Sequence, residues 1–140
     1  MSTAYFDTSA FMKLFVAESG STTTFRAWQR VSAVVGGRLL YVEARASLAA
    51  ALRGARLTLQ TYAEAKKSFE ELWKRVDVVE VSPVVTQLAG DLAEQHALRG
   101  YDAVHLASAL RAQADVLVCA DHDILHAARH RGLAVIDARS

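Results

Sequence analysis

The stretch Thr3-Ala4-Tyr5-Phe6-Asp7-Thr8-Ser9, near the amino terminus, sets the expected fold. Its first four residues read as a short strand that ends on the carboxylate of Asp7. Two hydroxyl residues and the apolar run 10–15 follow, which is typical of a capped helix. A strand that ends on an acid and turns into a helix exposes that acid at the edge of a parallel sheet. The same pattern is also an ordinary helix start, so later segments must decide.

The rest of the chain alternates strand-like apolar runs with helical segments. Further strands are expected at 32–35, 76–81, 116–119 and 133–136, and helices at 22–30, 38–53, 58–75, 82–98, 102–112 and 123–130. Gly36 and Gly37 are expected to stop the second strand, while Thr58 and Ser82-Pro83 are expected to begin helices. The strand at 76–81 is expected near a sheet edge. This α/β alternation predicts a parallel sheet that is covered by helices on both faces.

Aromatic side chains are concentrated in the helices of the first half. Phe25 and Trp28 are expected on the apolar face of the helix at 22–30, and Leu59 on that of the helix at 58–75. Trp28, Tyr62, Phe69 and Trp73 together supply more aromatic area than two helices need. We expect either an ordinary core or a groove for a partner helix or a dimer contact.

The bulk properties indicate one domain over residues 1–140. The chain has 140 residues and 52% hydrophobic content, with one Pro and seven Gly, enough to bury a core. No apolar run approaches the roughly 18 residues of a membrane span, and no signal peptide is recognisable at the start. Cys119 is the only cysteine, which rules out a disulfide within the chain. These features favour a reducing, cytoplasmic setting and no membrane association.

The charge balance becomes informative once five acids are assigned to one cleft. These acids are Asp7, Glu43, Asp102, Asp121 and Asp123. Without them, the sixteen Lys and Arg residues face ten acids, and twelve of the sixteen are Arg. Arginine suits bidentate contacts with phosphate, and an acidic focus within a basic shell suits a metal-dependent nuclease. Composition alone favours a charge-balanced soluble surface.

Four of these acids take comparable positions along the expected fold. Asp7 ends the first strand, Asp121 follows the strand at 116–119, Asp102 begins a helix, and Glu43 lies early in the helix after the second strand. The carboxyl edge of an open parallel sheet brings such positions together. Gathered carboxylates repel one another, so their convergence predicts a hard divalent cation, Mg2+ or Mn2+.

Each acid also has a simpler interpretation. Asp7 and Asp102 stabilise helix N-termini by about 0.3–1 kcal/mol each if they act only on the helix dipole. The sequence Asp121-His122-Asp123 is a plausible cap for the last helix. Glu43 has the weakest simple explanation, because its helix is otherwise very apolar. Taken together, the four acids favour a functional site.

Four blocks resemble the acidic motifs of PIN domains, most closely those of the VapC ribonuclease toxins of bacterial type II toxin–antitoxin pairs. They are Tyr5-Phe6-Asp7-Thr8-Ser9-Ala10, Tyr41-Val42-Glu43-Ala44, Tyr101-Asp102-Ala103-Val104-His105-Leu106-Ala107-Ser108-Ala109 and Cys119-Ala120-Asp121-His122-Asp123-Ile124-Leu125. The resemblance spans nearly the whole chain, with the family's order and spacing. The third block is the most specific of the four, and the Asp-Thr-Ser start is the least specific.

The resemblance implies a fold and an activity. It implies a three-layer α/β/α sandwich, a parallel sheet in the order 3-2-1-4-5, and a Mg2+- or Mn2+-dependent endoribonuclease. It further implies inhibition by a cognate VapB-type antitoxin, and a homodimer is expected. Hydrolysis in line, with metal-activated water and no side-chain nucleophile, would leave a 5′-phosphate and a 3′-hydroxyl.

The same resemblance assigns roles to individual residues. Asp7, Glu43, Asp102 and Asp121 are the expected catalytic metal ligands, and Asp123 is a possible fifth ligand or water anchor. Thr8 and Ser9 are expected to hydrogen-bond a ligand carboxylate or the phosphate, or to cap the helix. Lys13, Arg45 and Arg53 follow the first two acidic motifs and are candidate RNA contacts, although plain surface is the better interpretation of each one taken singly.

Two positions depart from the family pattern. Gly37 stands roughly where many relatives have a Ser that caps the helix bearing Glu43; because Gly is a tolerated cap, a cost of only a few tenths of a kcal/mol is expected. Cys119 stands where relatives often have Thr, which is expected to loosen the ordering of Asp121 without abolishing metal binding.

The histidines suggest weaker alternatives. His122, His126 and His130 repeat at the spacing of one helix face, but without a second ligand pair a solvated face is the better interpretation than zinc. His105 lies one turn after Asp102; a packed or half-exposed ring is expected there rather than a substrate contact.

Two other function classes compete with the nuclease. One is a catalytically silent PIN-like module that binds RNA or protein, which the presence of all four acids disfavours. The other is a receiver or phosphatase-like domain with Asp7 as phosphate acceptor. Such domains usually need a second adjacent acid or a late Lys, and no Lys follows Lys74.

Overall fold

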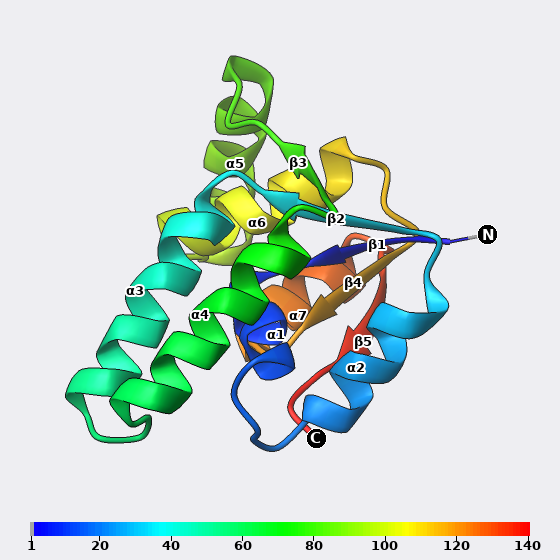
Figure 1. Cartoon of the computed structure of the whole chain (residues 1–140). Helices are drawn as coiled ribbons and strands as arrows, with labels where there is room; N and C mark the ends of the chain where they lie inside the picture. The colour runs from blue at the N-terminus through cyan, green and yellow to red at the C-terminus, as the bar shows by residue number, and fades with distance from the viewer. Residues whose placement is uncertain (1) are drawn as a thin grey trace.

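The computed structural model describes residues 2–140, and Figure 1 shows a twisted sheet surrounded by helices. Its five strands are parallel to their neighbours in the order β3-β2-β1-β4-β5. The strands are β1 (Thr3–Phe6), β2 (Ala33–Gly37), β3 (Val76–Val79), β4 (Val116–Cys119) and β5 (Ala134–Asp137). The helices are α1 (Thr8–Phe11), the 3-10 turn η1 (Met12–Leu14), α2 (Ser21–Arg30), α3 (Leu39–Arg53), α4 (Leu59–Trp73), α5 (Pro83–His96), α6 (Gly100–Arg111) and α7 (His122–His130). The predicted strand order and the edge position of β3 are confirmed.

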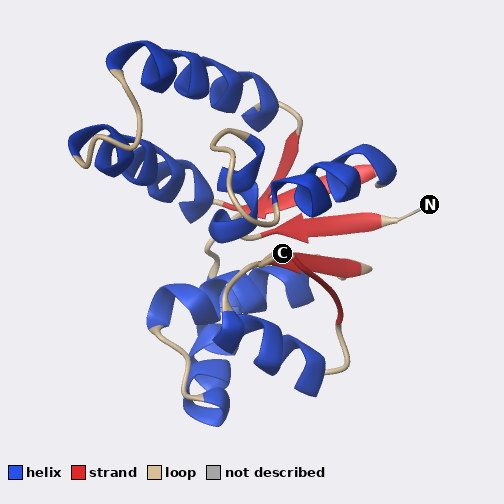
Figure 2. Cartoon of the chain, turned by 90° about the horizontal axis from the view of Figure 1, so that it is seen from below, coloured by secondary structure: helices blue, strands red, loops and turns tan. Residues whose placement is uncertain are grey.

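The sheet has a hydrophobic core on each face, because side chains alternate along its strands. In β1, Tyr5 belongs to the core that α5, α6 and α7 cover, with Leu106 and Leu117 among its members. The next residue, Phe6, belongs to the core beneath α1 to α4 and packs edge-on against Trp28. Figure 2 shows helices on both sides of the strands. The predicted three-layer arrangement is therefore confirmed.

Polar caps begin the two long helices that flank β3. The Thr58 hydroxyl accepts a hydrogen bond from the Thr61 amide at 3.1 Å and caps α4. The Ser82 hydroxyl accepts from the Val85 amide at 3.2 Å, and Pro83 occupies the first turn of α5. Both predicted helix starts are confirmed. None of the helices within residues 2–140 combines the length and the low polarity needed to cross a bilayer.

Three local expectations were wrong. The second strand does not stop before Gly36, because Gly36 and Gly37 pair with β3 and extend β2 to the edge of the sheet. Phe25 is 52% exposed, since α2 buries the neighbouring stripe that contains Trp28. Leu59 is 77% exposed, because it lies at the first position of α4, beyond the helix face that packs on the core.

The aromatic cluster is mostly core rather than groove. Phe69 is fully buried, and its ring contacts those of Phe11, Phe15 and Tyr41 at centroid distances of 5.9, 5.7 and 5.4 Å. Trp28 is buried as well. Trp28 and Phe69, two of the four aromatic residues considered for a partner groove, are therefore packed within the chain and not available to a partner.

Candidate functional site

The four expected acids lie at the carboxyl edge of the sheet. Asp7 directly follows β1, and Asp121 comes two residues after β4. Asp102 lies in the first turn of α6, and Glu43 in the second turn of α3, the helix after β2. Two side chains connect the acids: the charges of Asp7, Glu43 and Asp102 act on His105, and the guanidinium of Arg99 lies against Asp102 and Asp121.

Asp7 is the buried carboxylate of the site. It is 2% exposed, and its Oδ1 accepts the Ala10 amide at 3.0 Å as the cap of α1. The Ser9 hydroxyl donates to both carboxylate oxygens, at 2.8 and 2.9 Å, and accepts the Ala120 amide at 3.0 Å. The Cys119 thiol donates to Oδ2 at 3.2 Å. Burial nevertheless raises the pKa of Asp7, because its effect outweighs those of the charge of His105 and of these hydrogen bonds, which lower the pKa.

Glu43 is held by a polar network that crosses the core of the site. His105 Nε2 lies 2.7 Å from Glu43 Oε1, and the Thr8 hydroxyl donates to the same oxygen at 2.8 Å. On its other side, His105 Nδ1 lies 2.8 Å from the hydroxyl of Tyr5. Tyr5 is fully buried, and the His105 ring is 3% exposed. Three separate elements, β1, α1 and α6, thus fix the orientation of one carboxylate on α3.

Burial and the neighbouring charges shift the pKa values of Glu43 and His105 in opposite directions. Burial acts to lower the pKa of His105, but its hydrogen bond with Glu43 and the charges of Asp7, Glu43 and Asp102 outweigh burial and raise it. Partial burial acts to raise the pKa of Glu43, but the hydrogen bond and charge of His105 and the bond from Thr8 lower it. Burial raises the pKa of the Tyr5 hydroxyl. The pair of Glu43 and His105 is thereby favoured in its charged form.

Sequence reasoning missed this role of His105. A packed ring was correctly expected, but its bond with Glu43 was not. The available signal was an ionisable ring within the otherwise small and apolar run Ala103–Ala109 of α6, where a polar side chain must find a partner. The identity of that partner depends on how α3 and α6 meet.

Gly37 provides the space that the network needs. Gly37 is the last residue of β2, and the N-cap residue of α3 is Arg38. The expectation that Gly37 replaces a capping residue was therefore wrong. A Cβ atom at Gly37 would lie 2.7 Å from the Tyr5 hydroxyl oxygen and 3.8 Å from His105 Nδ1. Because that hydroxyl is fixed by hydrogen bonding, it has no room to retreat.

We expect Gly37→Ala to destabilise the fold by about 1–3 kcal/mol, the usual effect of overpacking a core. Urea unfolding monitored by circular dichroism measures this change. Gly90→Ala is the matched control: a Cβ there meets nothing within 4 Å, and in mid-helix it is expected to stabilise α5 by roughly 0.5–1 kcal/mol. Equal stabilities of the Gly37→Ala variant and the wild type would contradict the close approach to Tyr5.

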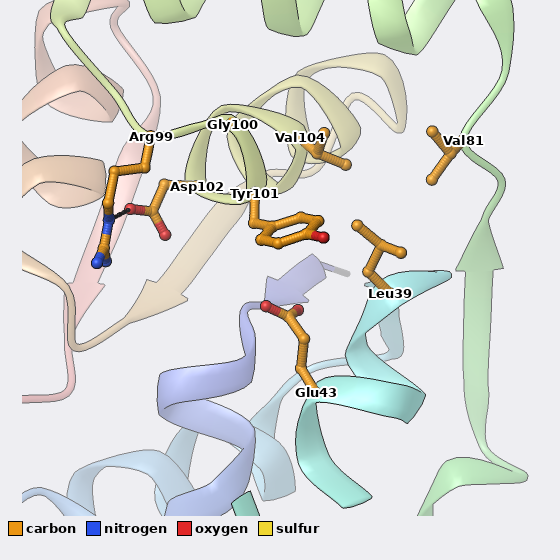
Figure 3. A pocket seen from close by; sticks show the side chains of 8 residues that line it. All are labelled: Leu39, Glu43, Val81, Arg99, Gly100, Tyr101, Asp102 and Val104. Carbon is orange, nitrogen blue, oxygen red and sulfur yellow. Dashed lines mark hydrogen bonds and ion pairs between the residues drawn. The ribbon is translucent and has the colours of Figure 1, made fainter. Parts of the chain in front are cut away.

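Arg99, also missed from the sequence, connects the two remaining acids. Its Nε donates to Asp102 Oδ2 at 2.9 Å, and its guanidinium lies 3.7 Å from Asp121 Oδ2. The Arg99 side chain is 81% exposed, whereas that of Asp102 is 15% exposed. Asp121 Oδ1 caps α7 by accepting the amides of Asp123 and Ile124. Figure 3 shows the Arg99–Asp102 ion pair at the rim of the pocket described below.

The acids are turned toward His105 and Arg99 rather than toward a common point that a metal ion could occupy. Across residues 2–140, no three His, Cys, Asp or Glu side chains stand in an arrangement able to hold a metal ion. Glu43 is turned toward His105, and Asp102 and Asp121 are turned toward Arg99. Any common cation would therefore require Arg99, which is the exposed member of these pairs, to move aside.

The other residues considered from the sequence lie outside this arrangement. The Lys13 amine is bound to the Glu18 carboxylate at 3.1 Å and to a backbone carbonyl. Arg45 donates to the Tyr41 hydroxyl at 2.8 Å. Arg53 lies in the last turn of α3, about 15 Å along the helix from Glu43. Asp123 is exposed at the start of α7.

Cys119 and the histidine stripe have structural surroundings. The Cys119 sulfur accepts the Asp121 amide at 3.3 Å besides donating to Asp7, and burial raises the pKa of its thiol. This residue therefore orders the turn between β4 and α7. The rings of His122 and His126 stack at 6.3 Å on the exposed face of α7, as the interpretation of a solvated face predicted.

A pocket of about 620 Å3 opens beside the acids. Figure 3 shows its lining, in which Asp102 lies beside Arg99, Glu43 comes from α3 below, and the Tyr101 ring projects above Glu43 toward Leu39. The lining residues are Leu39, Glu43, Val81, Arg99, Gly100, Tyr101, Asp102 and Val104. The pocket thus joins an apolar wall to the polar groups of the site.

Comparisons with known proteins agree with this geometry. Residues 4–130 match the model of the PIN domain family. The chain is 46% identical over 131 residues to ribonuclease VapC45 of Mycobacterium tuberculosis strain CDC 1551 and to ribonuclease VapC49 of strain H37Rv, covering 93% of this chain and 91% of each relative. A toxin-antitoxin complex from Klebsiella pneumoniae contains a chain with the same fold, at a TM-score of 0.69 and 18% identity, covering 96% of this chain and 97% of that one.

A parallel sheet in the order 3-2-1-4-5 with acids gathered at its carboxyl edge defines the class of protein. The chain belongs to the PIN domain family and, within it, to the VapC-type members.

Proposed function

We propose that the chain is a divalent-metal-dependent endoribonuclease that acts as the toxin of a toxin–antitoxin pair in the cytoplasm. One observation carries the proposal: four carboxylates from separate elements lie at one sheet edge, and one of them, Asp7, is buried despite the penalty on its charge. Proteins seldom bury a carboxylate without a functional reason. The identity to two proteins named ribonucleases supports RNA as the substrate.

The donor chemistry fits Mg2+ or Mn2+. Asp7, Glu43, Asp102 and Asp121 offer carboxylate oxygens, which are the ligands that hard divalent cations prefer. Arg99 supplies positive charge between Asp102 and Asp121, which marks the place where a cation is electrostatically favoured. When bound, the metal activates a water molecule and stabilises charge on the phosphoryl oxygens.

The chain's own residues orient these ligands and receive the substrate. Thr8 and His105 hold Glu43 in one orientation, and Ser9 and Cys119 do the same for Asp7. Arg99, released from Asp102 and Asp121, is placed to contact a phosphate of the RNA, since its long exposed side chain reaches the pocket. Asp123, exposed on the first turn of α7, anchors water near Asp121.

An antitoxin partner follows from the same relationships. The Klebsiella pneumoniae neighbour is part of a toxin-antitoxin complex, and the relatives carry VapC names. We infer a VapB-type antitoxin and a homodimeric toxin. Copurification of this chain with the product of a small reading frame next to its gene, with loss of RNA cleavage in the complex, tests the pairing.

The activity is tested by incubating total RNA with the purified chain in Mg2+ and in EDTA. We expect cleavage only with the metal, 5′-phosphate ends, and no cleavage by Asp102→Asn. Equal products in EDTA would contradict metal dependence. RNA binding without cleavage in Mg2+ or Mn2+ would instead support a silent PIN-like binding module.

Replacing Arg99 with Ala is expected to tighten Mg2+ binding roughly fivefold, because a competing positive charge within a few Å is removed. Isothermal titration calorimetry measures this affinity without RNA. Folding stability is expected to change little, since the Arg99 side chain is exposed. Arg99→Lys, which keeps the charge, is the control and should bind Mg2+ as the wild type does. Weaker Mg2+ binding by Arg99→Ala would contradict the competition.

A further inference from the structure

Tyr101 is an aromatic side chain that the fold itself does not use. It is 67% exposed and, among residues 2–140, makes no hydrogen bond, ion pair or ring contact. The other tyrosines near the sheet behave differently: Tyr5 is bonded to His105, and Tyr41 is bonded to Glu70 and packed on Phe69. The exposed ring is therefore available for a contact outside the chain.

The position of Tyr101 places its ring at the acids. The residue directly precedes Asp102 in the first turn of α6. It lines the 620 Å3 pocket together with Glu43 and Leu39, and the same three residues line a smaller adjoining hollow of about 180 Å3. Figure 3 shows the ring projecting over the space between Leu39 and Glu43. One face of the ring is thus available beside an apolar side chain.

We propose that Tyr101, backed by Leu39, is the stacking platform for an unpaired nucleobase of the RNA next to the cleaved phosphodiester; this rests on the proposed ribonuclease function. Unpaired bases are recognised by stacking on exposed aromatic rings, and every base offers such a face. Arg99 in the same pocket is placed to contact the adjoining phosphate. The site therefore selects single-stranded nucleotides over paired ones.

The charges in the pocket favour RNA over a second copy of the chain as the occupant. Glu43, Arg99 and Asp102 line the same pocket as Tyr101. The core of a protein–protein interface is depleted of charged residues, because burying them without partners is costly. A nucleotide lowers this cost, because its base covers the apolar wall while its phosphate can pair with the exposed guanidinium of Arg99.

The test compares the wild type with Tyr101→Ala and Tyr101→Phe. The probe is a mixed-sequence single-stranded RNA of ten nucleotides with 2-aminopurine at its centre, titrated in EDTA so that binding is read without cleavage. We expect stacking to quench the fluorescence with the wild type and the Phe variant. Tyr101→Ala should lose the quenching and bind about 5- to 150-fold more weakly, the usual range for one base–aromatic stack. The same RNA annealed to its complement should bind all three proteins alike.

Leu59→Ala is the matched control, because Leu59 is an exposed apolar side chain on a different helix, α4; its affinity should equal that of the wild type. Unchanged affinity and quenching with Tyr101→Ala would overturn the proposal. So would a shift of Tyr101→Ala from dimer to monomer in sedimentation velocity with unchanged RNA binding, which would assign the ring to a second copy. Absence of cleavage by the wild type in Mg2+ would refute the ribonuclease function alone, since binding is measured separately.

Discussion

Asp7→Asn is expected to reduce Mg2+-dependent RNA cleavage by more than about 100-fold, because loss of a residue that merely orients a metal ligand already costs 10- to 100-fold. The same variant is expected to fold at least as stably as the wild type. Its Oδ1 can still accept the Ala10 amide, whereas the cost of burying a negative charge, which is the cause of the raised pKa of Asp7, is removed. Cleavage of total RNA and thermal unfolding of the metal-free protein measure the two effects.

Asp77→Asn is the control for this experiment. Asp77 is an exposed acid on the edge strand β3, so both activity and melting temperature should match those of the wild type. A lower melting temperature for Asp7→Asn would mean that its carboxylate stabilises the fold, and the lost cleavage would then have a structural explanation. Retention of a tenth or more of the activity would remove Asp7 from the proposed ligands.

His105→Leu is expected to lower kcat/KM for RNA cleavage by about 10- to 100-fold, since Glu43 loses the group that orients it. The variant should also lose about 1–3 kcal/mol of stability, because the buried hydroxyl of Tyr5 is left without its partner. Urea unfolding and steady-state cleavage of a short RNA that spans a mapped site measure these effects.

The double variant Tyr5→Phe/His105→Leu separates orientation from stability. Removing both members of a buried polar pair is nearly neutral for folding, so the second change should recover most of the lost stability. Activity should stay low, because Glu43 still lacks His105. Recovery of activity together with stability would show that His105 acts only on the fold. Tyr5→Phe alone provides the reference for the cycle.

Much of the fold was predictable because apolar runs and helix-capping residues are local features of the sequence. The fourth strand was placed at Val116–Cys119 as observed, since an uninterrupted apolar run can form only a buried strand of that length. The caps at Thr58 and Ser82 were predictable because a hydroxyl there satisfies free helix amides. Gly36 and Gly37 led to a wrong boundary for the second strand. Glycine usually marks a turn, but here both residues pair with β3 and leave space for neighbouring side chains.

The sequence by itself determined the alternation of strands and helices, and with it the placement of Asp7, Glu43, Asp102 and Asp121 at strand ends and early helical turns. Only the tertiary structure decided how these carboxylates are partnered. Glu43 meets His105 across 62 positions of sequence, and Asp121 lies beside Arg99, which directly precedes α6. Periodicity fixes which face of an element a residue occupies, whereas the contacts between side chains depend on how helices pack and which rotamers that packing leaves open.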